Sequence, residues 1–139
     1  SSTGDLGATL LSVTSGVTVG SATTSMDLYV TGNAAAGVHN LGSKSSSFAI
    51  DMSVGNNFNF TIGGNITLNN PTNTQPGQSG TIKILQDGTG SRTLAFGGAW
   101  SFVDGTAPTI SAGAGTTSVL LYYVVDSSEI VTSSMLGVS

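Results

Sequence analysis

The chain has 139 residues, the length of one ordinary domain, and its three basic and seven acidic side chains give a formal net charge of −4. Three scattered Lys and Arg residues are too few to hold a nucleic-acid backbone, so we expect no nucleic-acid partner. Cys is absent, which excludes disulfides and thiolate metal sites. No apolar run approaches the ~20 residues of a membrane helix, so we expect no membrane insertion.

Strand signals follow one another along the chain, separated by turn residues, whereas helical periodicity is weak throughout. We predict strands at residues 8–13, 26–31, 48–52, 58–62, 66–68, 81–86, 92–96, 100–103, 118–125 and 129–132. Residues 32–47 are weakly patterned, and we expect an exposed loop or arm there. Strands that recur at such short intervals favour a sandwich or a barrel.

Apolar and polar residues alternate in several of these strands, which predicts one buried and one exposed face. The side chains expected in the core are Trp100, Phe102, Phe58, Phe60, Ile82, Ile84, Leu94 and Phe96. The run from 119 to 125 is apolar throughout, which is typical of a central strand covered on both faces.

Turn chemistry separates the strands. Gly63-Gly64 lies between two short strands and predicts a tight hairpin, as does the Asp87 to Gly90 turn. Residues 70–77 contain two Pro residues and form the best internal boundary. We therefore predict an all-β fold, an antiparallel, jelly-roll-like β-sandwich over residues 1–139, with an extended N-terminal arm or a small first sheet as a variant. The alternative division is 1–69 and 70–139.

Residues for chemistry are sparse. His39, the single histidine, lies in a Gly- and Ala-rich segment without a nucleophile motif nearby. The seven acids are scattered singly, which disfavours a glycosidase pair or a calcium loop. We expect no catalytic, cofactor-binding or metal-binding residues, and therefore no enzyme.

Aromatic residues are the candidates for contacts with other molecules. Tyr29, Tyr122 and Tyr123 are the side chains that we expect at a surface or between subunits. A surface of Ser, Thr, Asn and Gly with so little charge repels its neighbours weakly, which favours association.

Residues 57–132 resemble a β module of bacteriophage virion proteins, of the tail-fibre or minor structural type. The most specific parts are Gln86-Asp-Gly-Thr-Gly-Ser-Arg-Thr-Leu-Ala-Phe, the Trp100 element and the Pro108 element. The resemblance implies a structural role in the virion, on the outside of tail or head. It implies no catalytic residues.

We expect a homo-oligomer, namely a trimer, that acts as a tail-fibre or adhesion module for host attachment together with other virion proteins. One alternative is a capsid decoration protein that stabilises the phage head. Another is a carbohydrate-binding adhesin domain that recognises host-surface polysaccharide. Low charge favours neither the tail-fibre module nor the decoration protein.

Overall fold

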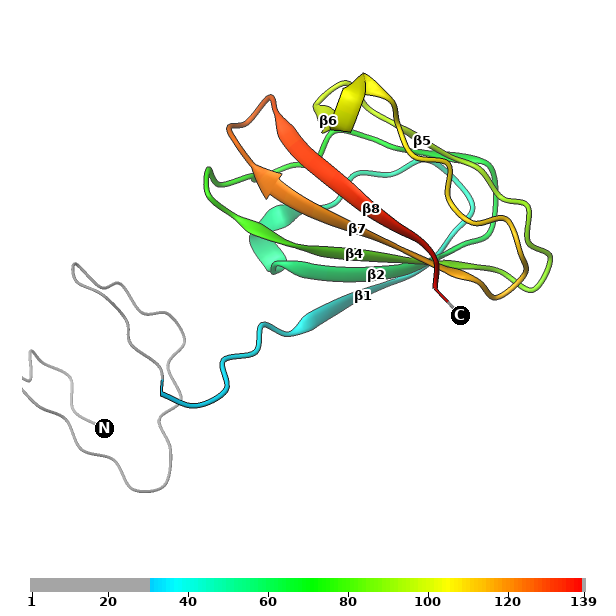
Figure 1. Ribbon diagram of the computed structural model, residues 1–139, viewed down its shortest axis with the longest axis horizontal. Helices are drawn as coiled ribbons and strands as arrows, with labels where there is room; N and C mark the ends of the chain where they lie inside the picture. Colours follow the sequence, from blue (N-terminus) through cyan, green and yellow to red (C-terminus); the bar gives the residue numbers. More distant parts are fainter. Residues whose placement is uncertain (1–30, 139) are drawn as a thin grey trace, which may run out of the picture. The chain divides into compact units, whose positions relative to one another are not determined.

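The computed structural model describes residues 31–138. The chain divides into two compact units, Ser1–Ala34 and Ala35–Ser139, and every strand of the described residues belongs to the second (Figure 1). Tyr29, the strand predicted at 8–13 and nearly all of the strand predicted at 26–31 lie outside the described residues.

Eight strands and two short 3-10 turns make up the described part. They are β1 (Val38–Lys44), η1 (Met52–Val54), β2 (Asn57–Ile62), β3 (Ile66–Leu68), β4 (Ser79–Gln86), β5 (Leu94–Phe96), β6 (Trp100–Phe102), η2 (Val103–Gly105), β7 (Thr117–Val124) and β8 (Ile130–Val138). The prediction of an all-β fold is confirmed. Among the described residues, no helix has the length and apolar character that a membrane crossing requires.

Six strands form one sheet in the order β1-β2-β4-β7-β8-β6, and β3 pairs with β5 in a second sheet. Four of the six strand pairs are parallel, and only β4 with β7 and β7 with β8 are antiparallel. The purely antiparallel pairing that we expected is therefore wrong, because the sheet is mixed. The jelly-roll arrangement stays a prediction, and β7 and β8 form an antiparallel hairpin.

The expected hairpins at Gly63-Gly64 and at Asp87 to Gly90 are also wrong, since β2 does not pair with β3, nor β4 with β5. Both turns are corners where the chain passes from the large sheet to the small one. Parallel neighbours need such a crossover, and β2 returns to β4 through β3. At the second corner the Asp87 carboxylate accepts hydrogen bonds from the Thr89 and Gly90 amides at 3.0 and 2.8 Å.

Alternation places the core on one face of the large sheet. In β2 the side chains of Phe58, Phe60 and Ile62 are buried, and in β7 every second side chain is buried. Ile66 and Leu68 of β3 belong to the same apolar cluster, so the small sheet covers this inner face. Burial of this kind contributes about 25 cal/mol per Å² of apolar surface.

Two segments differ from the sequence-based expectation. β1 occupies part of the stretch expected to be a loop or arm, at the end of the sheet beside β2. Residues 48–52 are not a regular strand but make two isolated bridges, from Phe48 to Leu68 and from Asp51 to Thr72. Because β2 pairs with β4, the described sheet continues across residue 70. The division of the whole chain into domains stays a prediction.

Candidate interaction surface

β7 has one buried face and one exposed face, although its side chains are apolar on both. Leu120 and Tyr122 point into the core, with 0% and 4% of their surface exposed. Leu121 and Tyr123 alternate with them and are 42% and 52% exposed. The expectation that this strand is covered on both faces is therefore wrong for the described residues.

We expected Tyr122 at a surface or between subunits. This expectation is wrong for the surface, because the side chain is buried in the core. Its hydroxyl donates a hydrogen bond of 2.7 Å to the carbonyl oxygen of Asn56, which anchors the loop before β2 to the centre of the sheet. Burial raises the pKa of Tyr122 to about 12, because the ionised phenolate would lose its hydration. Tyr123, the next residue, is exposed among the described residues.

The exposed face of β7 continues onto β8. In the strand pairing, Tyr123 lies opposite Val131, Leu121 opposite Ser133 and Val119 opposite Met135. Residues directly opposite each other share a face of the sheet. We call this surface, formed by Val119, Leu121, Tyr123, Val125, Val131, Ser133 and Met135, the outer face.

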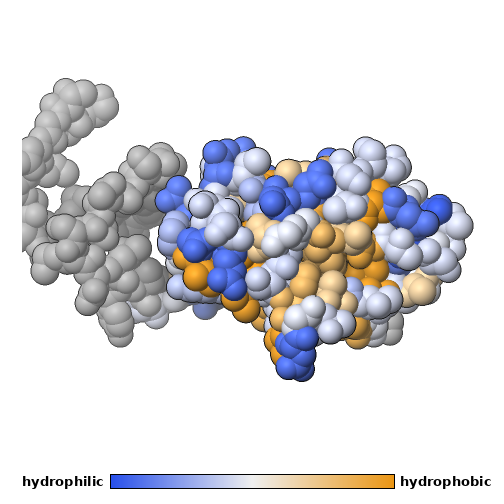
Figure 2. Space-filling view, turned by 90° about the horizontal axis from the view of Figure 1, so that it is seen from above, coloured by the Kyte–Doolittle hydropathy of each residue, from blue (hydrophilic) through white to orange (hydrophobic). Residues whose placement is uncertain are grey.

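Large exposed apolar side chains concentrate around the outer face. Ten such side chains occur among the described residues, and eight lie between Val103 and Val138 on η2, β7, β8 and the residue after β7. Figure 2, seen from above, shows apolar residues gathered in the middle of one side with hydrophilic residues around them. Contiguous apolar surface of this kind is typical of an interaction site.

Charge is nearly absent from this face. Lys83 of β4 lies opposite Val119 and is the one charged strand residue whose pairing places it on the outer face within the described part. Asp87 and Asp126 instead accept hydrogen bonds within their own turns. Hydrogen bonds from Arg92 lower the pKa of Asp87, and those from Ser128 lower the pKa of Asp126. These carboxylates stabilise local backbone geometry.

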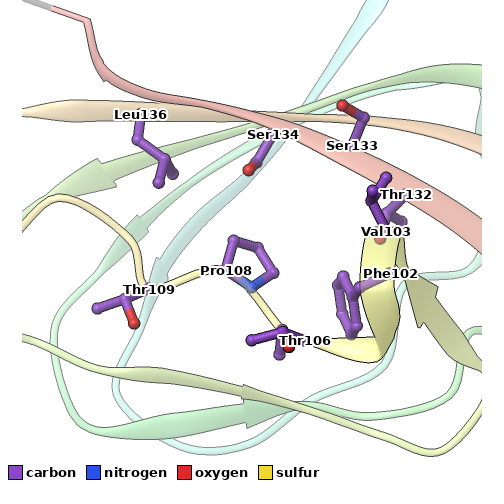
Figure 3. Close-up of a pocket in the computed structure, with 10 residues that line it drawn as sticks. Phe102, Val103, Thr106, Pro108, Thr109, Thr132, Ser133, Ser134 and Leu136 are labelled. Atoms are coloured by element: carbon purple, nitrogen blue, oxygen red, sulfur yellow. The ribbon is translucent and has the colours of Figure 1, made fainter.

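A pocket of about 560 Å³ lies beside β8, between this strand and the segment after η2 (Figure 3). Its walls combine apolar groups with hydroxyls and contain no ionisable side chain. They are formed by Phe102, Val103, Thr106, Ala107, Pro108, Thr109, Thr132, Ser133, Ser134 and Leu136. In Figure 3 Pro108 and Leu136 point toward each other across the space.

The pocket is continuous with the outer face. A shallower hollow is lined by Leu121, Tyr123 and Val131, and it shares Val103, Thr132 and Ser133 with the pocket. A molecule that covers the outer face would therefore also reach the edge of β8.

The predicted core residues lie on the opposite side of the sheet. Six of them are buried, namely Trp100, Phe58, Phe60, Ile82, Ile84 and Leu94. Phe96 and Phe102 are half-buried and pack against the core. The Trp100 indole N–H donates to the Asn69 carbonyl at 3.1 Å, which satisfies its polar atom.

Groups that could support catalysis or metal binding are dispersed. His39 lies on β1 with its ring centroid 6.3 Å from that of Phe58. Three or more His, Cys, Asp or Glu side chains do not come together at any point of the described residues. Sequence reasoning named Tyr123 but missed Leu121, Val131 and Met135. The unbroken apolar run of residues 119–125 was the signal for Leu121 alone.

A comparison with known protein families assigns the chain to one family. A family model described as "Putative phage tail fibre C-terminal domain" matches residues 48–124, which is more than half of the chain and extends from the Phe48 bridge to the end of β7. No curated protein and no solved structure matches. The chain thus belongs to the phage tail fibre C-terminal domain family and has a structural role in the phage virion.

Proposed function

We propose that the chain is a module of a phage tail fibre that works as a homo-oligomer, with the outer face lying between copies. The observation that carries this proposal is the concentration of exposed apolar side chains on β7 and β8. Covering them with a neighbouring copy removes apolar surface from water at about 25 cal/mol per Å².

The chemistry of the outer face favours a like surface as its partner. Tyr123 supplies a large, rigid side chain of the type enriched at the centre of protein interfaces. Among the strand residues of this face, only Lys83 could form an ion pair with a highly charged partner. Two uncharged apolar faces lose little by desolvation when they meet.

The location in the tail and the absence of catalysis belong to the same proposal. The family description supports a place in the tail rather than a decoration of the head. A structural module needs no reactive group, and the Asp87 and Asp126 carboxylates are engaged by their own turns. The trimer expected from the sequence is the proposed stoichiometry.

Sedimentation of the whole chain tests this proposal. We expect a defined oligomer at micromolar concentration, and Leu121→Asp should weaken its association by about tenfold or more, because a carboxylate would be buried between copies. Val54→Asp is the matched control, since Val54 is 45% exposed and lies on η1. A wild-type chain that stays monomeric at high concentration, or equal effects of the two substitutions, would contradict the proposal.

A further inference from the structure

One edge of the large sheet is incomplete at β8. β6 pairs with the first three residues of β8, so that Trp100 lies opposite Ile130 and Phe102 opposite Thr132. From Ser133 to Val138 the side of β8 that faces away from β7 has no strand partner among the described residues. We call this unpaired side of residues 133–138 the open edge.

The hydrogen-bonding groups of Ser134 point toward this open edge. The Ile130 amide donates to Ala99 on the β6 side at 2.8 Å, whereas the Glu129 carbonyl accepts from Val125 on the β7 side at 3.0 Å. Backbone groups alternate between the two sides of a strand. Thr132 and Ser134 therefore direct their N–H and C=O groups away from β7, as Ile130 does.

The pocket beside β8 lies where β6 would continue if it stayed in the sheet. The chain instead turns away through Asp104 and Gly105, which have φ values of 57° and 69°. The segment containing Pro108 then passes on the far side of the pocket (Figure 3). The result is a space of about 560 Å³ next to unpaired backbone.

The open edge lacks the side chains that normally prevent strand addition, and the register shift in its pairing with β7 lies only beyond Met135. Exposed edges are usually protected by Lys, Pro or inward-pointing charges. Residues 133–138 read Ser-Ser-Met-Leu-Gly-Val and contain none of these. Met135 and Leu136 are large, apolar and about half exposed.

The outer face alone is also too small for a stable contact. Its two strands, about 4.8 Å apart and about 26 Å long, cover roughly 10 by 26 Å. Stable interfaces bury about 800 Å² on each partner, about three times that plan area. A second contact next to the outer face is therefore expected, and the open edge adjoins it.

We propose that the open edge of β8 pairs with β1 of a second copy, so that the large sheet continues from one chain into the next. This inference rests on the homo-oligomer proposed above and names a second contact in it, beside the outer face. β1 is the opposite end of the same sheet, and the side facing away from β2 is unpaired among the described residues.

Strand direction agrees with this head-to-tail arrangement. β1, β2 and β4 are parallel, and β7 is antiparallel to both β4 and β8, so β1 and β8 run the same way. The added strand would pair in parallel, as β6 already does on this edge. A head-to-tail contact between different surfaces closes into a ring when the rotation allows it.

Ser134→Pro tests the open edge with little cost to the isolated fold. Proline removes an N–H that points away from β7, and proline is tolerated on the free side of an edge strand. We expect self-association to weaken by about tenfold or more, while Ser134→Ala, which keeps the N–H, changes it by less than about threefold. Circular dichroism and the thermal midpoint show whether the proline variant is folded.

Cysteine cross-linking identifies the partner strand. The chain has no Cys, so we would prepare Ser134→Cys and Asn40→Cys chains separately and oxidise them alone and mixed. We expect a covalent dimer in the mixture, and Ser43→Cys provides a second position on β1 should the register differ. A dimer formed by Ser134→Cys alone would show β8 against β8 and overturn the proposal.

The outcomes also separate this inference from the proposed function. If the wild-type chain forms an oligomer that Ser134→Pro leaves unchanged, the open edge is not a contact in it. If neither β1 position cross-links in the mixture, β8 does not pair with β1. In both cases the proposed homo-oligomer is not contradicted. If the wild-type chain is monomeric at high concentration, both fail. If the proline variant is unfolded, the cross-link in the mixture shows whether β8 pairs with β1 of a second copy.

Discussion

The two faces of β7 differ in their surroundings far more than in their composition. Leu120 and Leu121 are the same residue type at adjacent positions, yet one is fully buried and the other is 42% exposed. The inner face packs against β3 and the other core elements, whereas the outer face has no cover within the described residues. Apolar residues in a strand thus do not by themselves tell a buried face from an exposed one.

The largest effect on the inner face is expected from Trp100→Ala. The indole is 4% exposed, packs edge-to-face on Phe96 at 6.3 Å and donates to Asn69. Its removal leaves a large cavity and an unsatisfied carbonyl, so the free energy of unfolding should fall by roughly 3 to 5 kcal/mol. Chemical denaturation followed by fluorescence of the tyrosines or by circular dichroism measures this loss. A loss below about 1 kcal/mol would show that the ring is not part of the core.

The adjacent leucines give the sharpest comparison of the two faces. Leu120→Ala should cost about 2 to 5 kcal/mol of unfolding free energy, because the side chain is fully buried. Leu121→Ala should cost under about 0.5 kcal/mol in the monomer, since it lies on the surface. Both are measured by denaturation at concentrations where the chain is monomeric. Similar losses of unfolding free energy in the two variants would show that the two faces of β7 are not packed differently.

The adjacent tyrosines extend the comparison to one hydrogen bond. Tyr122→Phe removes the donor to Asn56 at 2.7 Å and should cost about 1 kcal/mol. Tyr123→Phe removes an exposed hydroxyl and should change the unfolding free energy by a few tenths of a kcal/mol at most. Equal values for the pair, measured by denaturant titration, would place both hydroxyls in the same environment.

The raised pKa of Tyr122 has the smallest effect on stability at neutral pH and shows only in alkaline solution. The pKa of Tyr122 is raised from 10.0 to about 12 in the folded chain by burial. The stability that Tyr122 contributes to the folded chain is complete below pH 10 and is lost as the pH rises from 10 to about 12. Over this range the tyrosine is ionised in the unfolded chain but still protonated in the folded one. Thermal midpoints across this range should fall, and the Tyr122→Phe variant should lack this part of the decline. An identical decline in the variant would assign it to other groups.

Alternation in the sequence predicted most strands but not their neighbours. Phe58, Phe60 and Ile62 define an exposed and a buried face of β2, and the structure contains that strand. The same pattern is compatible with parallel and antiparallel pairing, so it could not reveal that the Gly63-Gly64 turn leads into another sheet. Which strands pair is decided by long-range packing.

The edges of the sheet were the hardest elements to predict. β1 is exposed on both faces apart from Leu41 and Lys44, so it carries no period-two pattern. β8 was predicted only to Thr132, because Ser133, Ser134 and Gly137 interrupt its apolar sequence. Edge strands lack a consistent buried face, which is the signal that patterning detects.

The interaction surface was only partly predictable for a related reason. Tyr123 was expected at a surface, and the exposed neighbours Leu121 and Val131 were not, because apolar residues in a strand usually indicate the core. A run that is apolar on both faces has two explanations, a second covering layer in the same chain or a neighbouring molecule. The sequence does not separate them, and among the described residues no second layer covers the outer face.

Hydroxyl-radical footprinting of the assembled fibre tests most directly whether the outer face is covered by neighbouring copies. Tyr123 and Met135 are 52% and 51% exposed in the single chain, so both should be oxidised in dilute, monomeric protein. In the fibre we expect strong protection of both, with Val54 still reactive and Met52 protected in either state. Equal oxidation of Tyr123 and Met135 in fibre and monomer would contradict the account.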